Sequence, residues 1–375
     1  MTSAPSTADL TDRFRRLAAR AATAGADAVL ITPGADMRYF LGHSVASHER
    51  LTCLVVPADG PAHLLVPALE RLGWAGSPVE ALGLPLTTWV DGQDPYTELA
   101  ELLPSDARVL SVDYHMPAVH ALGARGAVPG SELTLAGETI AELRMRKSPA
   151  EIAALQAVGE AIDRVHLRIG EWLRPGRTEY EVAADITAAI LAEGHERADF
   201  VIVGSGPNGA SPHHEASDRP IRAGEPVVID IGGPAPDGYF SDCTRTYLTG
   251  GADADPEVRE VYEVVRAAQT AGVAAAVAGA TAESVDMASR TVVADAGYGD
   301  YFITRTGHGI GLEVHEHPYL VAGNTQVLEP GMAFSVEPGI YLPGRFGVRI
   351  EDIVVVTEDG PLLCNNAPTD LIVVG

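Results

Sequence analysis

The sequence predicts an α/β domain over residues 1–143 and a larger α+β domain over residues 149–375 that contains an internal repeat. Helix-like and strand-like segments alternate through about the first 140 residues, a pattern typical of α/β layers. A capping signal at residues 148–151 then opens a series of helix, helix, strand and hairpin that occurs twice. At 375 residues the chain is long enough for two hydrophobic cores.

In the N-terminal part, residues 8–22 have the apolar spacing of an amphipathic helix, and residues 27–31 form the first expected strand. Further strands are expected at residues 54–56, 64–66 and 109–112. The loop over residues 42–50 carries His43, His48, Glu49 and Arg50 without the spacing of a metal site. Both a polar surface loop and a rim that touches substrate fit this loop.

Capping residues mark the helix starts of the C-terminal part. Ser148 and Glu151 form a capping box with Pro149 at the first helical position, and Thr178 with Glu181 repeats the box. The expected helices cover residues 149–173, 178–193, 255–278 and 281–296, and strands are expected at residues 200–203 and 301–304.

An acidic hairpin is expected over residues 227–246, with a β-branched strand, a turn at residues 234–238 and a returning strand. A turn centred on Pro236 places Asp230 opposite Asp242. Two buried carboxylates repel each other, and Arg245 should point to the other face, so a bound cation is the simplest explanation. Two solvated loop aspartates are the alternative, and they fit the apolar strand around Asp230 poorly.

The same arrangement returns in residues 332–357, where two apolar runs are joined around Pro343-Gly344. Counting outward from this turn places Glu337 opposite Glu351. Glu337 follows Asp230 by 107 residues and Glu351 follows Asp242 by 109, which indicates an internal duplication. Four converging carboxylates nearly balance the charge of two divalent ions.

His308 lies between two glycines in the segment GHGIGLEVHEH, just before the second hairpin. The glycines leave its imidazole accessible, and its position favours a role as a ligand. The expected metal ligands are then one nitrogen and four carboxylates: Asp230, Asp242, His308, Glu337 and Glu351. This donor set suits Mn²⁺, Co²⁺ or Fe²⁺, with Zn²⁺ also compatible, and a pair of such ions can hold a bridging hydroxide.

Two further histidines are expected at the same cavity. By the repeat, the loop over residues 206–214 should reach it from the other side, and His213 is favoured as a donor to a carbonyl oxygen because Pro212 fixes the preceding backbone. His315 lies seven residues after His308 and fits the same pocket. The other histidines of this part are interpreted as a surface side chain, His214, and structural side chains, His166 and His195.

Three side chains near the expected ligands are candidates for substrate contacts. Arg349 is two residues before Glu351 and therefore shares its face. There it pairs with the metal-bound carboxylates, receives a substrate carboxylate or forms an ordinary salt bridge. Tyr239 and Tyr341 flank the hairpins and either orient ligands and substrate or pack in the core. Asp352 points to the opposite face and is not expected to be a ligand.

Composition argues against several classes of function. The net charge of −25 disfavours nucleic acid and anionic membranes as partners. The N-terminus lacks the features of a signal peptide, and no apolar stretch is long enough to span a bilayer. Cys53, Cys243 and Cys364 are widely spaced, which argues against a cysteine zinc site and favours a reducing, cytoplasmic location.

The motifs IDIGG, SDCTRT, GHGIGLEVHE, SVEPGIY and VRIED resemble, in this order, the five-ligand pattern of the pita-bread metallopeptidases. The N-terminal domain and the junction RMRKSPAEI are similar to the proline-specific branch of that group, the Xaa-Pro dipeptidases (prolidases) and aminopeptidases P. The resemblance covers essentially the whole chain. It implies a creatinase-like N-terminal domain and a pita-bread C-terminal domain with a pseudo-twofold repeat.

The resemblance also implies a reaction, the hydrolysis of an Xaa-Pro bond by a hydroxide that bridges two ions, commonly manganese or cobalt. Glu337 would accept the proton of the bridging water, and His213 and His315 would stabilise the tetrahedral intermediate. Substrates would be short proline-containing peptides, and the enzyme would be a homodimer with the N-terminal domain of one subunit near the other's site. His317 departs from the expected pattern, which bears on substrate detail and not on the metal.

Three alternatives remain at this point. An aminopeptidase P, which removes the first residue of longer Xaa-Pro peptides, is the closest, and the compact length favours the dipeptidase. The creatinase pattern of non-peptide hydrolases lacks the metal ligands, whereas all five are present here. A catalytically silent binding protein would be expected to have lost one or more of these residues.

Overall fold

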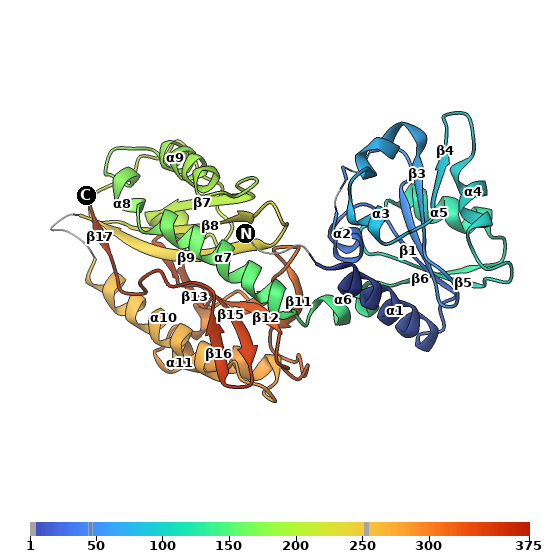
Figure 1. Ribbon diagram of the computed structural model, residues 1–375. Coiled ribbons are helices and arrows are strands. Elements are labelled where there is room, and N and C mark those ends of the chain that lie inside the picture. Colours follow the sequence, from blue (N-terminus) through green and yellow to red (C-terminus); the bar gives the residue numbers. More distant parts are fainter. Residues whose placement is uncertain (1–4, 44, 47, 251–254) are drawn as a thin grey trace. The chain divides into compact units, whose positions relative to one another are not determined.

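A computed structural model describes residues 5–43, 45–46, 48–250 and 255–375 (Figure 1). The chain divides into two units between Arg144 and Met145, and each unit is described by itself. None of the helices in the described residues combines the length and apolar content that a bilayer span needs.

The N-terminal unit is built on a mixed six-stranded sheet of order β4-β3-β2-β1-β5-β6. Its strands are β1 (Ala28–Ile31), β2 (Cys53–Pro57), β3 (His63–Pro67), β4 (Leu86–Trp89), β5 (Val109–Val112) and β6 (Glu132–Leu135). Its helices are α1 (Thr7–Thr23), α2 (Ala35–Leu41), the 3-10 helix η1 (Ala68–Trp74), α3 (Pro78–Ala81), α4 (Pro95–Glu101), α5 (Ala118–Ala127) and α6 (Gly137–Arg144). The expected α/β domain is confirmed, including its first helix and four of its strands.

The loop after α2 is held by local contacts within this unit. Arg50 pairs with Asp91 at 2.9 Å and with Glu49 at 2.6 Å, and His43 Nε2 lies 2.9 Å from the carbonyl oxygen of Gly73. The second interpretation of this loop, a rim that touches substrate, stays a prediction.

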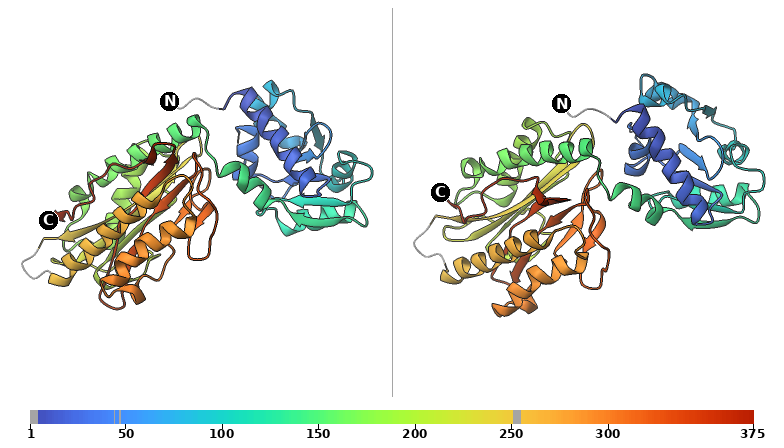
Figure 2. Two further views of the ribbon diagram at one scale, coloured as in Figure 1. Left: turned by 90° about the horizontal axis from the view of Figure 1, so that it is seen from below. Right: turned by 60° about the horizontal axis from the view of Figure 1, so that its bottom comes forward.

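In the C-terminal unit the capping signals are confirmed. Ser148 and Glu151 form the capping box of α7 (Pro149–His166), and Thr178 and Glu181 form that of α9 (Glu179–Ala192). The remaining helices are α8 (Ile169–Trp172), α10 (Pro256–Ala275) and α11 (Ala282–Asp295), and the last two lie side by side (Figures 1 and 2).

Two main sheets carry the acidic hairpins. The first has the order β17-β9-β8-β7 and consists of β7 (Phe200–Ser205), β8 (Pro226–Pro234), β9 (Phe240–Thr249) and β17 (Val373–Val374). The second has the order β11-β10-β12-β15-β16 and consists of β10 (Gly307–Gly309), β11 (Glu316–Leu320), β12 (Ala333–Val336), β15 (Asp352–Thr357) and β16 (Gly360–Leu363). β13 (Gly339–Leu342) and β14 (Phe346–Arg349) form a separate ribbon, and the short 3-10 helices are η2 (Gly206–Ala210) and η3 (Gly299–Tyr301).

Apolar packing follows the internal repeat. Helices α7 and α9 pack on the first hairpin through a cluster that includes Ile162, Val182 and Ile229, while α10 packs on the second through Val261 and Ile340 among others. Each half therefore buries its acidic hairpin beneath its own helices, as a duplicated pita-bread domain requires.

The register of the first hairpin differs from the prediction by two residues. Asp230 lies opposite Thr244, and Asp242 lies opposite Gly232. The ladder continues to Pro234 and Phe240, so the turn is centred on Asp237 and not on the preceding proline. Because the shift is an even number, both carboxylates still lie on the same face of the sheet.

The register of the second hairpin is as predicted. Val336 pairs with Asp352 in one ladder and Gly339 pairs with Arg349 in the next, which is the register that places Glu337 opposite Glu351.

The strand expected at residues 301–304 is wrong. The chain instead makes η3 and then buries Phe302 in the core. Arg290 donates hydrogen bonds to the carbonyl oxygens of Phe302 and Thr304, each at 2.9 Å, so these acceptors are satisfied by a side chain and not by a neighbouring strand.

Candidate metal centre

The five predicted ligands come from strands of both halves of the repeat. Asp230 and Asp242 lie on β8 and β9, and His308 lies on β10. Glu337 directly follows β12, and Glu351 directly precedes β15. The structure brings all five to the wall of one cavity of about 690 Å³.

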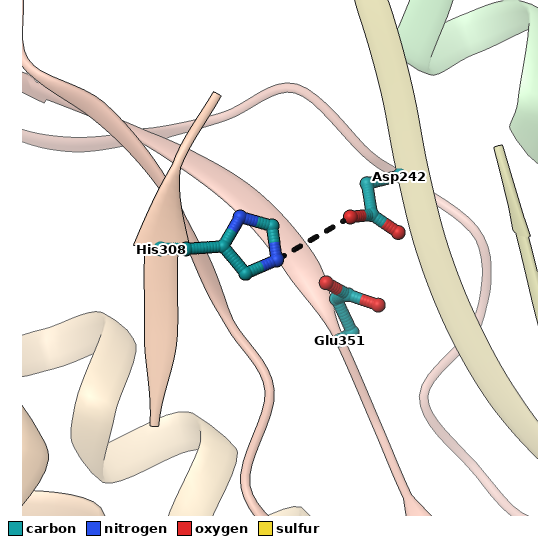
Figure 3. Close-up of side chains that lie close together, drawn as sticks. All are labelled: Asp242, His308 and Glu351. Atoms are coloured by element: carbon teal, nitrogen blue, oxygen red, sulfur yellow. Dashed lines mark ion pairs between the residues drawn. The ribbon is translucent and has the colours of Figure 1, made fainter. Parts of the chain in front are cut away.

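His308 presents a ring nitrogen to this acidic cluster. Its Nδ1 lies 3.2 Å from the carbonyl oxygen of Gly309, which accepts a proton held on Nδ1, so that Nε2 can give its lone pair to a metal ion once one is bound. Nε2 lies 3.1 Å from Glu337 Oε1 and 3.6 Å from Asp242 Oδ2. Ligand atoms of Asp242, His308 and Glu351 all lie within 4.8 Å of one another, as a metal ion requires (Figure 3).

Two buried carboxylate oxygens test whether a cation fits. Arg349 donates to Asp230 Oδ2 at 2.6 Å, and Thr244 donates to Glu351 Oε2 at 2.7 Å. The second oxygen of each acid, Asp230 Oδ1 and Glu351 Oε1, is buried without a hydrogen-bond partner among the described residues. Since unpaired buried carboxylate oxygens are costly, these atoms together with the His308 lone pair fit divalent cations well.

The electrostatics of the cluster point the same way. Burial raises the pKa of Asp242 well above its usual value, and the negative charges of Glu351, Asp230 and Glu337 raise it further. Burial also raises the pKa of Glu351, with the same kind of repulsion from Glu337 and Asp230. Four ionised acids are therefore unfavourable here unless positive charge lies among them.

Glu337 is the exception within the cluster. Burial favours its protonated form, but the hydrogen bond and the charge of His308 outweigh burial and hold the pKa of Glu337 below its usual value. Ser335 also donates to Glu337 Oε1 at 3.1 Å. An ionised carboxylate at this position can accept a proton.

His213 and His315 line the same cavity as the four acids and His308. The ring centroid of His315 lies 4.2 Å from that of His308, in an edge-to-face arrangement. Desolvation, followed by the positive charges of His308 and Arg305, lowers the pKa of His315 to about 4. A neutral imidazole at the cavity wall can donate one N–H.

Arg349 pairs with the acidic cluster, and its contact with a substrate carboxylate stays a prediction. Besides Asp230, its guanidinium donates to Thr244 Oγ1 at 3.1 Å, to the hydroxyl of Tyr341 at 2.8 Å and to the carbonyl oxygen of Pro212 at 3.3 Å. Tyr341 is buried, lines the cavity and orients this arginine.

Comparison with known proteins agrees with this arrangement of acids and histidine. Residues 153–358 match Metallopeptidase family M24, and residues 13–146 match the Creatinase/Prolidase N-terminal domain.

The chain belongs to metallopeptidase family M24.

Relatives of this M24 peptidase match it along nearly their whole length. It is 52% identical over 365 residues to a probable dipeptidase PepE of Mycobacterium tuberculosis, covering 96% of each chain. It is 38% identical to an Xaa-Pro dipeptidase of Lactobacillus helveticus, covering 89% of this chain and 91% of the relative. The crystal structure of the dipeptidase PepE from Mycobacterium ulcerans superposes with a TM-score of 0.93 at 50% identity, covering 99% and 100%. Peptidases of this family depend on divalent metals.

Other side chains of the M24 peptidase take structural positions. The nitrogens of His166, the last residue of α7, bond to Tyr247 and to the carbonyl of Cys243. His195 bonds to Ser241, but it lies after the end of α9 and not on a helix as expected. On the opposite face of the hairpin, Arg245 pairs with Asp352 at 2.6 Å.

The role of Tyr239 in substrate contact stays a prediction. The hydroxyl of this tyrosine donates to Glu151 at the start of α7 at 2.7 Å, and the residue is not among the described residues that line the cavity.

The sequence interpretation missed Glu179 and placed His214 wrongly at the surface. Glu179 is fully buried and accepts hydrogen bonds from the backbone and hydroxyl of both Ser205 and Ser217. His214 Nε2 lies 2.8 Å from Glu179 Oε2, and Asn208 donates to the same carboxylate. This network fixes the loop that carries His213. In the sequence, Glu179 is recognisable only as an acid at the first position of α9, and acids are ordinary at a helix start.

Proposed function

We propose that this protein hydrolyses the Xaa-Pro bond of Xaa-Pro dipeptides in a metal-dependent reaction. The observation that carries the proposal is the cavity in which four acids and His308 converge and two buried carboxylate oxygens have no protein partner among the described residues. The similarity to the Xaa-Pro dipeptidase of Lactobacillus helveticus supports the choice of substrate.

In this proposal two divalent ions are held by Asp230, Asp242, His308, Glu337 and Glu351, with Mn²⁺ first and Co²⁺, Fe²⁺ or Zn²⁺ as alternatives. When bound, such ions supply an activated water nucleophile and polarise the scissile carbonyl.

The protein side chains then move protons and stabilise charge. The Glu337 carboxylate accepts a proton from the attacking water and passes it to the leaving imide nitrogen. His213 and His315 donate hydrogen bonds to the carbonyl oxygen as negative charge develops on it. Arg349 pairs with Asp230 at 2.6 Å, which opposes the effect of burial on the pKa of Asp230 and fixes the orientation of its carboxylate.

We also propose the domain roles, oligomeric state, location and partners of the enzyme. Residues 149–375 form the catalytic domain and residues 1–143 the N-terminal domain of a cytoplasmic homodimer that acts on short proline-containing peptides. Neither nucleic acid nor a membrane is expected as a partner, given the net charge of −25.

Two alternatives change the substrate and keep the site. An aminopeptidase P would cleave longer Xaa-Pro peptides, and a hydrolase of the same fold could act on a non-peptide substrate. The presence of all five ligands argues against the creatinase type of chemistry, whose pattern lacks them.

The proposal is tested by proline release from an Xaa-Pro dipeptide by metal-stripped protein before and after addition of Mn²⁺. We expect release only with metal, and none from Glu337→Ala under the same conditions. A loaded wild-type protein that leaves both dipeptides and longer Xaa-Pro peptides intact would overturn the assignment.

A further inference from the structure

Residues 302–306 lead from η3 to β10, and helix α11 holds this segment through two side chains. Arg290 donates to the carbonyl oxygens of Phe302 and Thr304, each at 2.9 Å, and its guanidinium carbon lies 4.1 Å from the ring centroid of Phe302. Asp286, four residues earlier on the helix, pairs with the same guanidinium at 2.9 Å. One acid and one arginine of a single helix therefore fix the backbone that enters the site.

Asp286 is fully buried, and both of its carboxylate oxygens accept hydrogen bonds. The backbone N–H and the hydroxyl of Thr306 donate to Asp286 Oδ1 at 3.2 and 2.8 Å. Nε of Arg290 donates to Oδ2 at 3.0 Å. Asp286 is not among the described residues that line the cavity, so its most direct route to the site is through Thr306.

Thr306 connects this acid to two of the predicted ligands. Its carbonyl oxygen accepts a hydrogen bond from the backbone N–H of Glu337 at 2.8 Å. His308 is two residues further on, and its N–H donates to Ser335 Oγ at 3.0 Å, a hydroxyl that donates to Glu337 Oε1 at 3.1 Å. At Gly307 the chain passes so close to Ser335 that a Cβ would overlap the serine carbonyl oxygen. A shift of Thr306 should therefore move Glu337 as well.

The first half of the repeat contains a similar arrangement. Glu179 on α9 is also fully buried, and it accepts hydrogen bonds from the N–H and the hydroxyl of Ser205 at 2.8 and 2.7 Å. Ser205 ends β7, just before the loop that carries His213. In each half a buried acid on a helix thus holds a hydroxyl residue on the segment that enters the site.

We propose that Asp286 is a positioning residue for the reaction, and that through Thr306 it sets where the Glu337 carboxylate accepts the proton of the attacking water. The inference rests on the proposed function and adds to it a residue outside the cavity. Proton transfer requires hydrogen-bond distance, and a misplacement of about 1 Å can cost about 100-fold in rate. Because this distance matters for the chemical step and not for substrate binding, the effect belongs to kcat and not to KM.

The test measures proline release from an Xaa-Pro dipeptide by full-length protein at saturating Mn²⁺, well below the melting temperature of each variant. In Asp286→Asn an amide N–H faces the donors of Thr306 or Arg290, so kcat should fall about tenfold to 100-fold with KM within about twofold. Thr306→Val removes one hydrogen bond at nearly constant volume and should lower kcat about threefold to tenfold. Thr306→Ser keeps the hydroxyl and should stay within about twofold of the wild type.

Thr32→Val is the matched control, since Thr32 makes the same pair of hydrogen bonds within the N-terminal unit. Its N–H and hydroxyl donate to the buried Asp113 at 2.7 and 2.9 Å. This variant should lose unfolding free energy much as Thr306→Val does, while its kcat stays within about twofold of the wild type.

Three results would overturn the role of Asp286 alone: a wild-type kcat in Thr306→Val, a rise in KM without a fall in kcat, or an equal fall of kcat in Thr32→Val. No proline release by the wild type would overturn the proposed function and this inference with it.

Discussion

His213 lies in the cavity wall on a loop from the first half of the repeat, whereas His308 and His315 come from the second half. If it donates to the developing oxyanion, His213→Ala should lower kcat by about 10²–10³ and leave KM nearly unchanged, because the interaction forms only in the transition state. Steady-state kinetics on an Xaa-Pro dipeptide measures this split. A rise in KM with unchanged kcat would assign His213 to ground-state binding instead.

Glu179, on α9, holds the loop that carries His213 through hydrogen bonds with His214 and Ser217. Glu179→Gln replaces an acceptor oxygen with donors that face the N–H and O–H groups of Ser217, so the loop should shift and kcat should fall between about tenfold and 100-fold. A double-mutant cycle is the decisive readout, since the effect on kcat should largely vanish in the His213→Ala background. Full additivity of the two changes would show that Glu179 supports only general stability.

The acidic cluster was predictable at this scale because acids inside β-branched, apolar strands are costly to bury unless a cation lies among them. Glu179 was not predictable, since its partners lie 26 to 38 residues away and no local pattern indicates them. The pairing of Arg349 with Asp230 also depends on a contact across the repeat, which the sequence does not show.

At the scale of secondary-structure elements, β14 and η2 pack closely against each other where Gly347 meets Gly209. A Cβ at Gly347 would overlap the carbonyl oxygen of Gly209, so Gly347→Ala should push η2 away from the cavity. We expect a loss of about 1–3 kcal/mol in unfolding free energy and a clear loss of activity, measured by denaturant melts and kinetics. Gly126→Ala on α5, where a Cβ meets open space, should be neutral or slightly stabilising. Equal behaviour of the two variants would contradict this account.

Local sequence patterns predicted where helices begin, but they did not predict the register of the first hairpin. Capping boxes at Ser148 and Thr178 depend on contacts three residues apart, and both helices begin where expected. The first hairpin turned about Asp237 because Gly238 donates to the carbonyl of Ala235 and closes the turn there, a choice that composition alone leaves open. At residues 301–304, side-chain hydrogen bonds from Arg290 replaced the expected strand pairing.

At the scale of the whole molecule, the lowered pKa of the buried His166 makes the free energy of unfolding depend on pH. Burial, and then the charge of Arg245, lowers the pKa of His166 to about 3, far below the value of about 6.5 expected in the unfolded chain. The unfolded state therefore binds one more proton between these values, and stability falls as pH drops from about 6.5 toward 3, by about 1.4 kcal/mol per pH unit from this group.

The measurement is a series of denaturant melts from pH 7 to pH 4.5 in the presence of chelator, for the wild type and for His166→Gln. The variant should be less stable at pH 7 but show a shallower loss on acidification. Parallel curves for the two proteins would contradict the assignment of this dependence to His166.

At the scale of the whole chain, the internal repeat of the sequence predicted the two similar halves of the C-terminal domain. The helix pairs and acidic hairpins recur at an offset near 107 residues, and each half buries its own hairpin. The five predicted ligands come from both halves of the duplication and line one cavity.

Titrating metal-stripped protein with Mn²⁺ and counting the bound ions per chain tests most directly whether this cavity holds two divalent ions. The account predicts two ions in the wild type with a rise in melting temperature, and fewer ions with a smaller rise in Asp242→Asn. Absence of bound Mn²⁺ in the wild type, or the same count and melting shift in the variant, would contradict it.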